Sequence, residues 1–255
     1  MTDDELAAAV DANYWESFAL MAKSCGGDVL TREGVLAVST GLPVAMLNIG
    51  FVKKPLANPH SSLREMVEFY DSAGLPFVLR VREGVDRDAE EAMEAMGLPY
   101  GDTVPGMTLH PLPASPEPVG GLEIETVRDE QRLCRYQEVA AEGFGMPIDF
   151  VKQLMGPRLL DVPGFESYLG IMGGEAVATS SLYTGGGIAG VYNVATLASH
   201  RRRGIGEAMT WHSVSRSREL GCSVATLQAS VMGQPVYARM GFRAVAPYRT
   251  FHRPD

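Results

Sequence analysis

The sequence has few cysteines and no long apolar run. Its cysteines, Cys25, Cys134 and Cys222, are odd in number and widely spaced, which argues against a disulfide framework or a zinc site. No apolar stretch approaches the roughly 18–20 residues that a membrane-spanning helix needs. The acidic start, Asp3 to Glu5, lacks the basic and then apolar pattern of a signal peptide. We therefore expect a cytoplasmic protein without a metal and without a membrane partner.

Positive charge is scarce in the first part of the chain, because residues 1–115 carry the whole net charge of −9. From residue 200 onward the balance reverses, since arginines outnumber Glu207, Glu219 and Asp255. An acidic chain without a basic stripe interleaved with aromatic residues is a poor candidate for nucleic-acid binding. We expect no nucleic-acid partner and an anion site towards the C-terminus. The acidic balance favours a cationic amine over an acidic acceptor.

Apolar periodicity predicts an α/β (α+β) fold in which helices alternate with short strands. Helices are expected over residues 5–21 and 60–73, the second beginning at Ser61 or Ser62 as N-cap. A strand-like apolar stretch after Gly41-Leu42-Pro43 predicts a strand over residues 44–52. Further helices are expected over 86–96, 129–142, 147–155, 205–220 and 235–240, and further strands or extended stretches over 29–32, 35–40, 77–81, 100–110, 122–127, 168–172, 176–183, 191–197, 224–229 and 242–251.

Prolines crowd residues 111–119, which can be neither a helix interior nor a central strand. We predict a linker there, between a domain over residues 1–110 and a domain over residues 120–255. The two segments end alike. Met96-Gly97-Leu98 in the first and Met240-Gly241-Phe242 in the second are each followed by an extended stretch of nearly the same length. This similarity indicates a diverged duplication. Chance is the alternative, because a Met-Gly pair is common.

The most informative stretch is residues 191–206. A buried strand over 191–197 runs into a turn containing Arg201–Arg203, after which Gly204 and Gly206 open a helix. A helix start leaves N–H groups unpaired and carries partial positive charge. Glycine lets the backbone approach a phosphate closely, and arginine can bind it through two hydrogen bonds. The stretch therefore predicts an anion cradle.

The pattern Arg201-x-x-Gly204-x-Gly206 resembles the R/Q-x-x-G-x-G/A motif of the GNAT superfamily of N-acetyltransferases. A strand before it, a helix and a strand after it, and Tyr237–Phe242, which resembles the family's Y-x-x-x-G-F box, extend the resemblance. Other phosphate-binding motifs fit less well. A dinucleotide fingerprint needs a glycine where Met209 stands, and the G-K-[ST] of an NTPase loop is missing.

The resemblance implies tandem GNAT-like domains, each with a mixed, mostly antiparallel twisted sheet and helices on both faces, and acetyl-CoA as co-substrate. By position in the motif, the cofactor-binding residues would be Val194, Ala195 and Thr196 along the pantetheine arm, Arg201, Arg202, Arg203, Gly204, Ile205 and Gly206 around the pyrophosphate, and Ser230. Tyr237 matches the family tyrosine that protonates the departing thiolate, and a phenol of pKa ~10 suits that role. A packed tyrosine without a catalytic role is the alternative.

The sequence does not single out a general base. A primary ammonium of pKa ~10 has to lose a proton before it can attack a thioester at neutral pH. Where relatives have glutamate on the two central strands, this chain has Gly190 and Ala225. The remaining candidates are Glu166, Asp149, His200, His212, His252 and the terminal carboxylate of Asp255.

These features predict an acetyl-CoA-dependent N-acetyltransferase that acts on a primary amine of a small molecule or peptide. The alternative is a non-catalytic acyl-CoA-binding module with a regulatory or interaction role. It is motivated by the missing glutamates and by the first half, which has Phe51–Pro55 and no glycine pair where the second half has its cradle. A third hypothesis gives the acidic first half a surface for a basic partner. Whether the chain forms a homodimer stays open.

Overall fold

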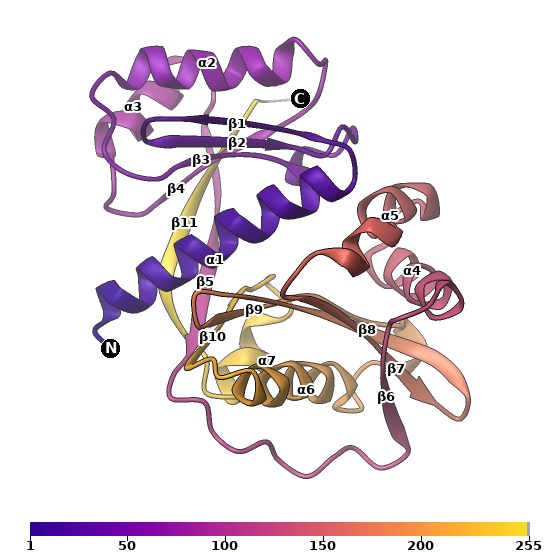
Figure 1. Cartoon of the computed structure of the whole chain (residues 1–255). Coiled ribbons are helices and arrows are strands. Elements are labelled where there is room, and N and C mark those ends of the chain that lie inside the picture. The colour runs from indigo at the N-terminus through magenta and orange to yellow at the C-terminus, as the bar shows by residue number, and fades with distance from the viewer. Residues whose placement is uncertain (254–255) are drawn as a thin grey trace.

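One continuous sheet of eleven strands forms the centre of the molecule (Figure 1). The computed structural model describes residues 1–253. The strand order is β1-β2-β3-β4-β11-β5-β10-β9-β8-β7-β6, and every pair is antiparallel except β3–β4 and β9–β10. The strands are β1 (Asp28–Arg32), β2 (Val35–Ser39), β3 (Asn48–Val52), β4 (Val78–Arg82), β5 (Tyr100–Leu109), β6 (Leu122–Thr126), β7 (Phe165–Met172), β8 (Glu175–Gly185), β9 (Ile188–Thr196), β10 (Val224–Gln228) and β11 (Arg243–His252).

Helices cover both faces of this sheet. They are α1 (Asp3–Ser24), α2 (Pro59–Asp71), α3 (Arg87–Ala95), α4 (Glu130–Phe144), α5 (Ile148–Leu154), α6 (Ile205–Glu219) and α7 (Gln234–Arg239). Helices α4 and α6 pack on β8 and β9 from opposite sides, and α1 lies in the bend of the sheet, against strands of both halves (Figure 1). The predicted fold class, a mixed, mostly antiparallel sheet with helices on both faces, is confirmed. Within residues 1–253, no helix is both long and apolar enough to cross a bilayer.

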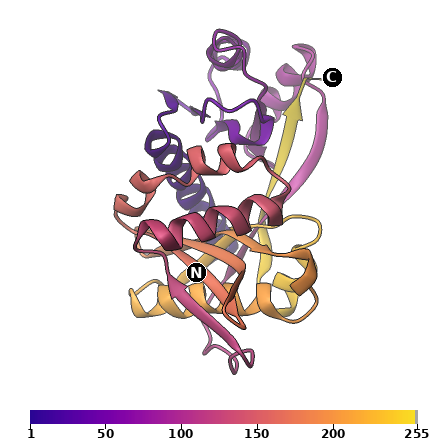
Figure 2. The same cartoon turned by 90° about the vertical axis from the view of Figure 1, so that its right-hand side faces the viewer.

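The final strands of the two halves exchange places. Strand β11 lies between β4 and β5 of the first half, and β5 lies between β11 and β10 of the second half. Figure 2 shows β11 running along both halves. The two expected sheets are therefore joined into one. The exchange gives β4 and β10 backbone hydrogen-bond partners, where each would otherwise have an open edge.

Two local predictions are wrong. Residues 44–52 are not one strand, because a 3-10 turn (Ala45–Leu47) precedes β3. The side chain of Asn48 donates to the carbonyls of Leu42 and Pro76 at 2.8 and 2.9 Å, and such side-chain bonds compete with an extended ladder. Helix α2 is capped by Asn58, whose Oδ1 accepts from the Ser61 N–H, and neither Ser61 nor Ser62 is its N-cap.

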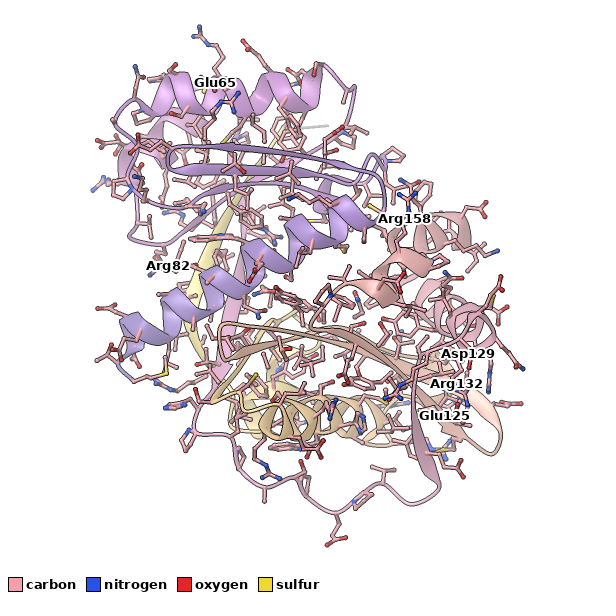
Figure 3. The ribbon with its side chains drawn as sticks, viewed as in Figure 1. Glu65, Arg82, Glu125, Asp129, Arg132 and Arg158 are labelled. Atoms are coloured by element: carbon pink, nitrogen blue, oxygen red, sulfur yellow. The ribbon has the colours of Figure 1, made fainter. Side chains whose placement is uncertain are left out.

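Buried polar contacts attach α1 to the sheet. Asp11 accepts a hydrogen bond from Tyr248 of β11 at 2.6 Å and from Nε of Arg82 of β4 at 2.9 Å. Figure 3 labels Arg82 beside α1. Arg80 donates to the hydroxyl of Tyr14. Burial raises the pKa of Asp11, although the Tyr248 hydroxyl and the Arg82 charge act in the opposite direction. Helix α1 is thereby tied to β4 of its own half and to the exchanged strand β11.

Candidate active site

Strands β9 and β10 part at the centre of the sheet. They pair in parallel only from Ile188–Gly190 to Val224–Thr226. Beyond these pairs β9 continues to Thr196 along β8, while β10 continues along β5. The edge of β9 that faces away from β8 therefore leaves backbone N–H and C=O groups of residues 191–196 without a strand partner in the described part of the chain, and such groups can pair with an extended ligand.

A β-bulge marks the same part of β9. The register with β8 shifts between Thr179 and Ser181, and Asn193 has a left-handed φ of 52°. The Thr179 hydroxyl donates to the carbonyl of Asn193 at 2.8 Å and holds this conformation. A bulge redirects the side chains beside it. As a result Tyr192 and Asn193 both line a cavity on the face of the sheet that carries α4.

The predicted glycine turn opens α6 directly beside the end of β9. Gly204 is the N-cap at φ 76°, a conformation that suits glycine, and no side chain caps the helix. A Cβ on Gly206 would lie 3.4 Å from Oγ1 of Thr196 and 4.0 Å from Cγ1 of Val194. Ile205 is buried beneath the turn. The N–H groups of the helix start and the free strand edge thus lie side by side, and a side chain at Gly206 would extend into the space between them.

The three arginines of the turn are exposed but differ in their contacts. Arg201 donates to the carbonyl of Thr196 at 3.0 Å and to that of Gly143, at the end of α4, at 3.2 Å. Arg201 therefore braces the turn against β9 and α4. Arg202 has a φ of 63° and Arg203 contacts the sulfur of Met172. Both residues come directly before the start of α6 and carry positive charge.

Helix α4 approaches β9 closely at Gly143. A Cβ on Gly143 would lie only 2.8 Å from that of Ala195, so a larger residue would push the helix away. Ala195 therefore faces α4, whereas Val194 packs with α6 and α7. The three residues predicted along the pantetheine arm, Val194 to Thr196, thus lie at the open edge between these helices.

Tyr237 reaches the same place from α7. It packs in one apolar cluster with Val194 and Trp211. Burial raises the pKa of Tyr237, while the neighbouring Thr210 hydroxyl acts in the opposite direction. The phenol is therefore protonated at neutral pH. Exposed Ser230 lies nearby, where its Oγ accepts from the N–H of Gly233 at 3.1 Å.

Two buried polar atoms of β10 have no hydrogen-bond partner among the described residues. They are Oγ1 of Thr226 and Nε2 of Gln228. Thr226 opposes Gly190 in the last β9–β10 pair. Because side chains alternate along a strand, Thr226 and Gln228 face away from the apolar cluster that contains Ala225 and Leu227. Unpaired polar atoms at the point where the strands part fit a ligand-binding site.

The candidates for a general base do not gather at this site. Glu166 is held by Arg216 of α6 at 2.9 Å and by the Tyr168 hydroxyl at 2.6 Å. Burial raises its pKa, but those hydrogen bonds and the Arg216 charge outweigh it, and the pKa of Glu166 is lowered. His212 packs edge-on against Tyr168, and burial lowers its pKa. Both side chains thus contact the α6 face, away from the cavity.

The other candidates are no closer. Asp149 is exposed in the first turn of α5, and His200 binds the hydroxyl of Ser199. His252 pairs with Val78 of the first half, and Asp255 lies outside the described residues. None of the five described candidates lines the cavity beside the bulge.

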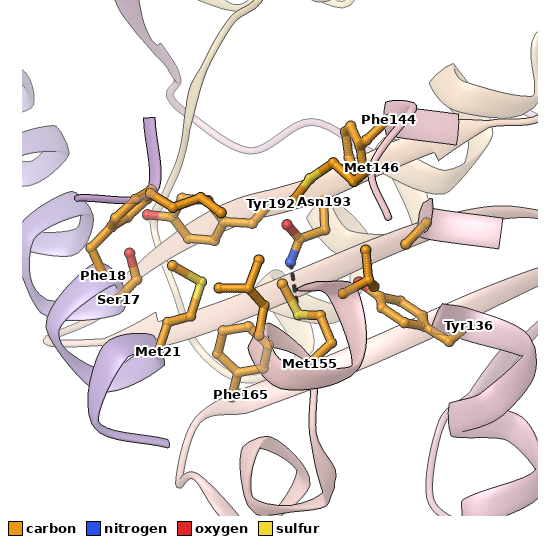
Figure 4. Close-up of a pocket in the computed structure, with 14 residues that line it drawn as sticks. Ser17, Phe18, Met21, Tyr136, Phe144, Met146, Met155, Phe165, Tyr192 and Asn193 are labelled. Carbon is orange, nitrogen blue, oxygen red and sulfur yellow. Dashed lines mark hydrogen bonds between the residues drawn. The ribbon is translucent and has the colours of Figure 1, made fainter. Parts of the chain in front are cut away.

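That cavity has a volume of about 230 Å³ and lies between α1, α4, α5 and β9 (Figure 4). Its walls include Met21 of α1, Tyr136 of α4, Met155 after α5 and Asn193 of β9. Sequence reasoning missed it because the lining segments are far apart in the chain. The only local signal was an asparagine inside a β-branched run, which favours a left-handed bulge residue.

The polar groups of the cavity are neutral. Oγ of Ser181 lies 2.8 Å from the Tyr136 hydroxyl, 3.1 Å from Oγ of Ser167 and 3.3 Å from Nδ2 of Asn193. The Tyr192 hydroxyl donates to Oδ1 of Asn13 in α1 at 2.7 Å. Burial raises the pKa of Tyr136 to about 12.

The first half has no equivalent opening. Its parallel strands β3 and β4 stay paired along the whole of β3, from Ile49–Val52 to Val78–Val81. The helix that follows, α2, begins with Pro59 after the side-chain cap of Asn58, without a glycine pair. Among the described residues, the parting of strands next to an uncapped helix start is thus a feature of the second half.

Comparison with known proteins agrees with these features. Residues 117–242 match the model of the Acetyltransferase (GNAT) family. The chain is therefore a GNAT superfamily protein, with the matched family domain in its second half. No curated protein matches the chain.

Solved structures share the fold over most of the chain. A GCN5-related N-acetyltransferase from Kribbella flavida has a TM-score of 0.71 at 18% identity, covering 89% of this chain and 90% of that one. One from Sphaerobacter thermophilus has a TM-score of 0.62 at 17% identity, covering 87% and 78%. A tandem GNAT protein from the clavulanic acid biosynthesis pathway has a TM-score of 0.57 at 15% identity, covering 85% and 77%. At these identities the likeness shows the fold alone, a two-part GNAT arrangement.

Proposed function

We propose that the chain is an N-acetyltransferase that moves the acetyl group of acetyl-CoA to a primary amine in the cytoplasm. The observation that carries this proposal is the parting of β9 and β10 beside the uncapped start of α6. An extended pantetheine arm needs backbone partners, and a pyrophosphate needs N–H donors without side chains in the way. Both kinds of group are available side by side, at the end of β9 and at the start of α6.

Different residues would contact different parts of acetyl-CoA. The backbone of Val194–Thr196 would pair with the pantetheine arm, and the N–H groups of Gly204–Gly206 would hold the pyrophosphate. Arg202 and Arg203 would add charge, while Arg201 keeps the turn in place through Thr196 and Gly143. The exposed hydroxyl of Ser230 is free to donate to the same molecule. Bound acetyl-CoA supplies the thioester whose acetyl group is transferred.

Direct attack requires two proton movements. The amine nitrogen bonds to the carbonyl carbon, the carbon–sulfur bond breaks, and the departing thiolate takes a proton. We expect Tyr237 to donate that proton, because it packs in one cluster with Val194 and stays protonated at neutral pH. The ammonium releases one proton to water before it reacts, because an apolar site disfavours the charged form. After attack the nitrogen gives up a second proton, which restores the Tyr237 phenol directly or through water.

The domain assignment follows the same reasoning. We propose that residues 120–255 carry acetyl transfer, that residues 111–119 link the halves, and that residues 1–110 hold no second molecule of acetyl-CoA. The unbroken pairing of β3 and β4 supports the last point. Helix α1 nevertheless belongs to the active site, because it forms one wall of the cavity.

The test measures release of the CoA thiol from acetyl-CoA with a panel of primary amines. Replacing Tyr237 with Phe should lower kcat by about 10²–10⁴, the usual contribution of a general acid, with acetyl-CoA binding unchanged by calorimetry. Tyr100→Phe, at an exposed position of the first half, is the matched control and should be fully active. Tight binding without turnover on any amine would favour the non-catalytic acyl-CoA-binding module instead.

A further inference from the structure

We propose that the cavity beside the Asn193 bulge receives an uncharged, apolar group of the acceptor, so that the substrate is an alkyl- or arylalkylamine and not a polyamine or a charged peptide end. This inference rests on the proposed acetyltransferase function and names its acceptor class. It also revises the preference for a cationic acceptor that the acidic composition suggested.

The position of the cavity connects it to the transfer site. Tyr192 and Asn193 line it, and the next three residues of β9 form the free edge assigned to pantetheine. The bulge turns two consecutive side chains towards the same face. A group bound in the cavity therefore lies immediately beside the strand segment along which the acetyl donor would extend.

The chemistry of the walls selects against charge. The lining consists of aliphatic, aromatic and methionine side chains with a few neutral polar groups, and it contains no Asp, Glu, Lys, Arg or His. Burying an unpaired charge in such surroundings is very unfavourable. A second ammonium group or a carboxylate on the acceptor would find no partner here. An apolar substituent would instead gain the free energy of leaving water.

The size of the cavity sets the scale of the group. An apolar cavity of about 150 Å³ holds a benzene molecule. The cavity here measures about 230 Å³, which is room for a substituted aromatic ring or a branched chain of similar bulk. Met21, Met146 and Met155 contribute flexible side chains that adapt to the shape of the ligand.

The neutral polar groups lie along one side. Tyr136 and Asn193 are joined through Ser181, and Tyr192 is joined to Asn13. The hydroxyls of Tyr136 and Tyr192 and the Nδ2 group of Asn193 thus have partners within the protein, and an apolar ligand does not have to supply them. Because Ser17, Phe18 and Met21 come from α1, the first half of the chain helps to determine which acceptor fits.

A matched pair of amines tests the inference. 4-Methylbenzylamine and p-xylylenediamine have the same ring and reacting group and differ by a second ammonium. With acetyl-CoA as donor, kcat/KM should be at least about a hundredfold higher for 4-methylbenzylamine, because the ammonium cannot be buried unpaired. Comparable values, or a preference for the diamine, would overturn the proposal.

A variant that fills the cavity provides the second measurement. Met146 is half-buried at the cavity wall, so Met146→Trp should fold and reduce the available volume. It should raise KM for 4-methylbenzylamine at least about tenfold more than it raises KM for methylamine, which is too small to fill the cavity. Met96→Trp, at a half-buried methionine after α3, is the control and should change neither. Equal effects of both variants would contradict the assignment.

Two further results separate this inference from the proposed function. If no amine, including methylamine, releases CoA thiol, the transferase proposal fails. Calorimetry with 4-methylbenzylamine then tests by itself whether the cavity binds an apolar amine. Binding to the wild type that is lost in Met146→Trp supports this proposal, and absence of binding refutes it. If octanoyl-CoA replaces acetyl-CoA and Met146→Trp impairs only the longer donor, the cavity holds an acyl chain and the acceptor proposal is wrong.

Discussion

Gly206 lies in the first turn of α6, beside the end of β9. A Cβ there would meet Thr196 at 3.4 Å, an ordinary contact, but further atoms would enter the space between Val194 and the helix N–H groups. Gly206→Ala should therefore bind acetyl-CoA nearly as well as the wild type, as the motif's G/A alternative implies. Gly206→Val should weaken binding by about tenfold or more, equivalent to about 1.4 kcal/mol, measured by calorimetry. A valine variant that binds as well as the alanine control would place the phosphate elsewhere.

The pH dependence of the reaction follows from the groups at the site. The described lining of the cavity contains no carboxylate or histidine, and burial holds the pKa of Tyr136 at about 12. The reactive species is then the neutral amine, so kcat/KM should rise tenfold per pH unit up to the pKa of the amine itself, about 10 for an alkylamine. Because the pKa of Tyr237 is raised, this side chain loses its proton at a higher pH than an ordinary phenol does.

Amines of different basicity check this profile. Each should show an inflection at its own pKa when kcat/KM is measured against pH. One shared inflection near neutrality, independent of the amine, would instead identify a general base in the enzyme.

Single residues differ in how far the sequence alone could place them. The roles proposed for Gly204 and Tyr237 came from a motif whose spacing is local, and they stay predictions. In the structure Gly204 begins α6, and Tyr237 packs in one cluster with Val194 of β9. Asn193 was not predicted, because a bulge depends on the register with β8, which lies on another strand. The contacts of Arg201 with two carbonyls were equally hidden, since Gly143 comes from a helix far away in the sequence.

At the scale of elements, helix α1 is the component whose role the sequence least revealed. Its helical periodicity was predicted, and the observed helix extends that prediction at both ends with a capping box between Thr2 and Glu5. Its position could not be predicted, because helical spacing does not say which strands a helix covers. The 3-10 turn before β3 was missed for a similar reason, since Asn48 reaches Pro76 across the fold.

The hydrogen bond between Tyr248 and Asp11 fastens α1 to β11. Tyr248→Phe would leave a buried carboxylate with one donor fewer, so the free energy of unfolding should fall by about 1–3 kcal/mol in urea denaturation. Tyr100→Phe removes a hydroxyl at an exposed site and should change it by less than about 0.5 kcal/mol. If Tyr248→Phe were as stable as this control, the Arg82 ion pair alone would hold the helix.

For the whole molecule, the exchanged strands imply that the halves do not fold independently. The first half lacks β11 and the second lacks β5 when the chain is divided in the predicted linker. We expect fragments 1–110 and 111–255 to be unfolded apart and to regain structure when mixed, measured by circular dichroism. The intact chain should unfold in one transition, monitored by Trp15 in the first half and Trp211 in the second. Two separate transitions would mean that each half is stable without the other's strand.

The exchange of β5 and β11 also concerns the order in which a ribosome makes the chain. Strand β4 and its eventual neighbour β11 are separated by most of the second half, which takes roughly ten to thirty seconds to synthesise at typical rates. During that interval the edge of β4 in the nascent first half has no partner strand. The position between β4 and β5 has to stay open until β11 is made. A message truncated before the codon for Arg243 would therefore leave both halves unfinished, even though the first had been translated in full.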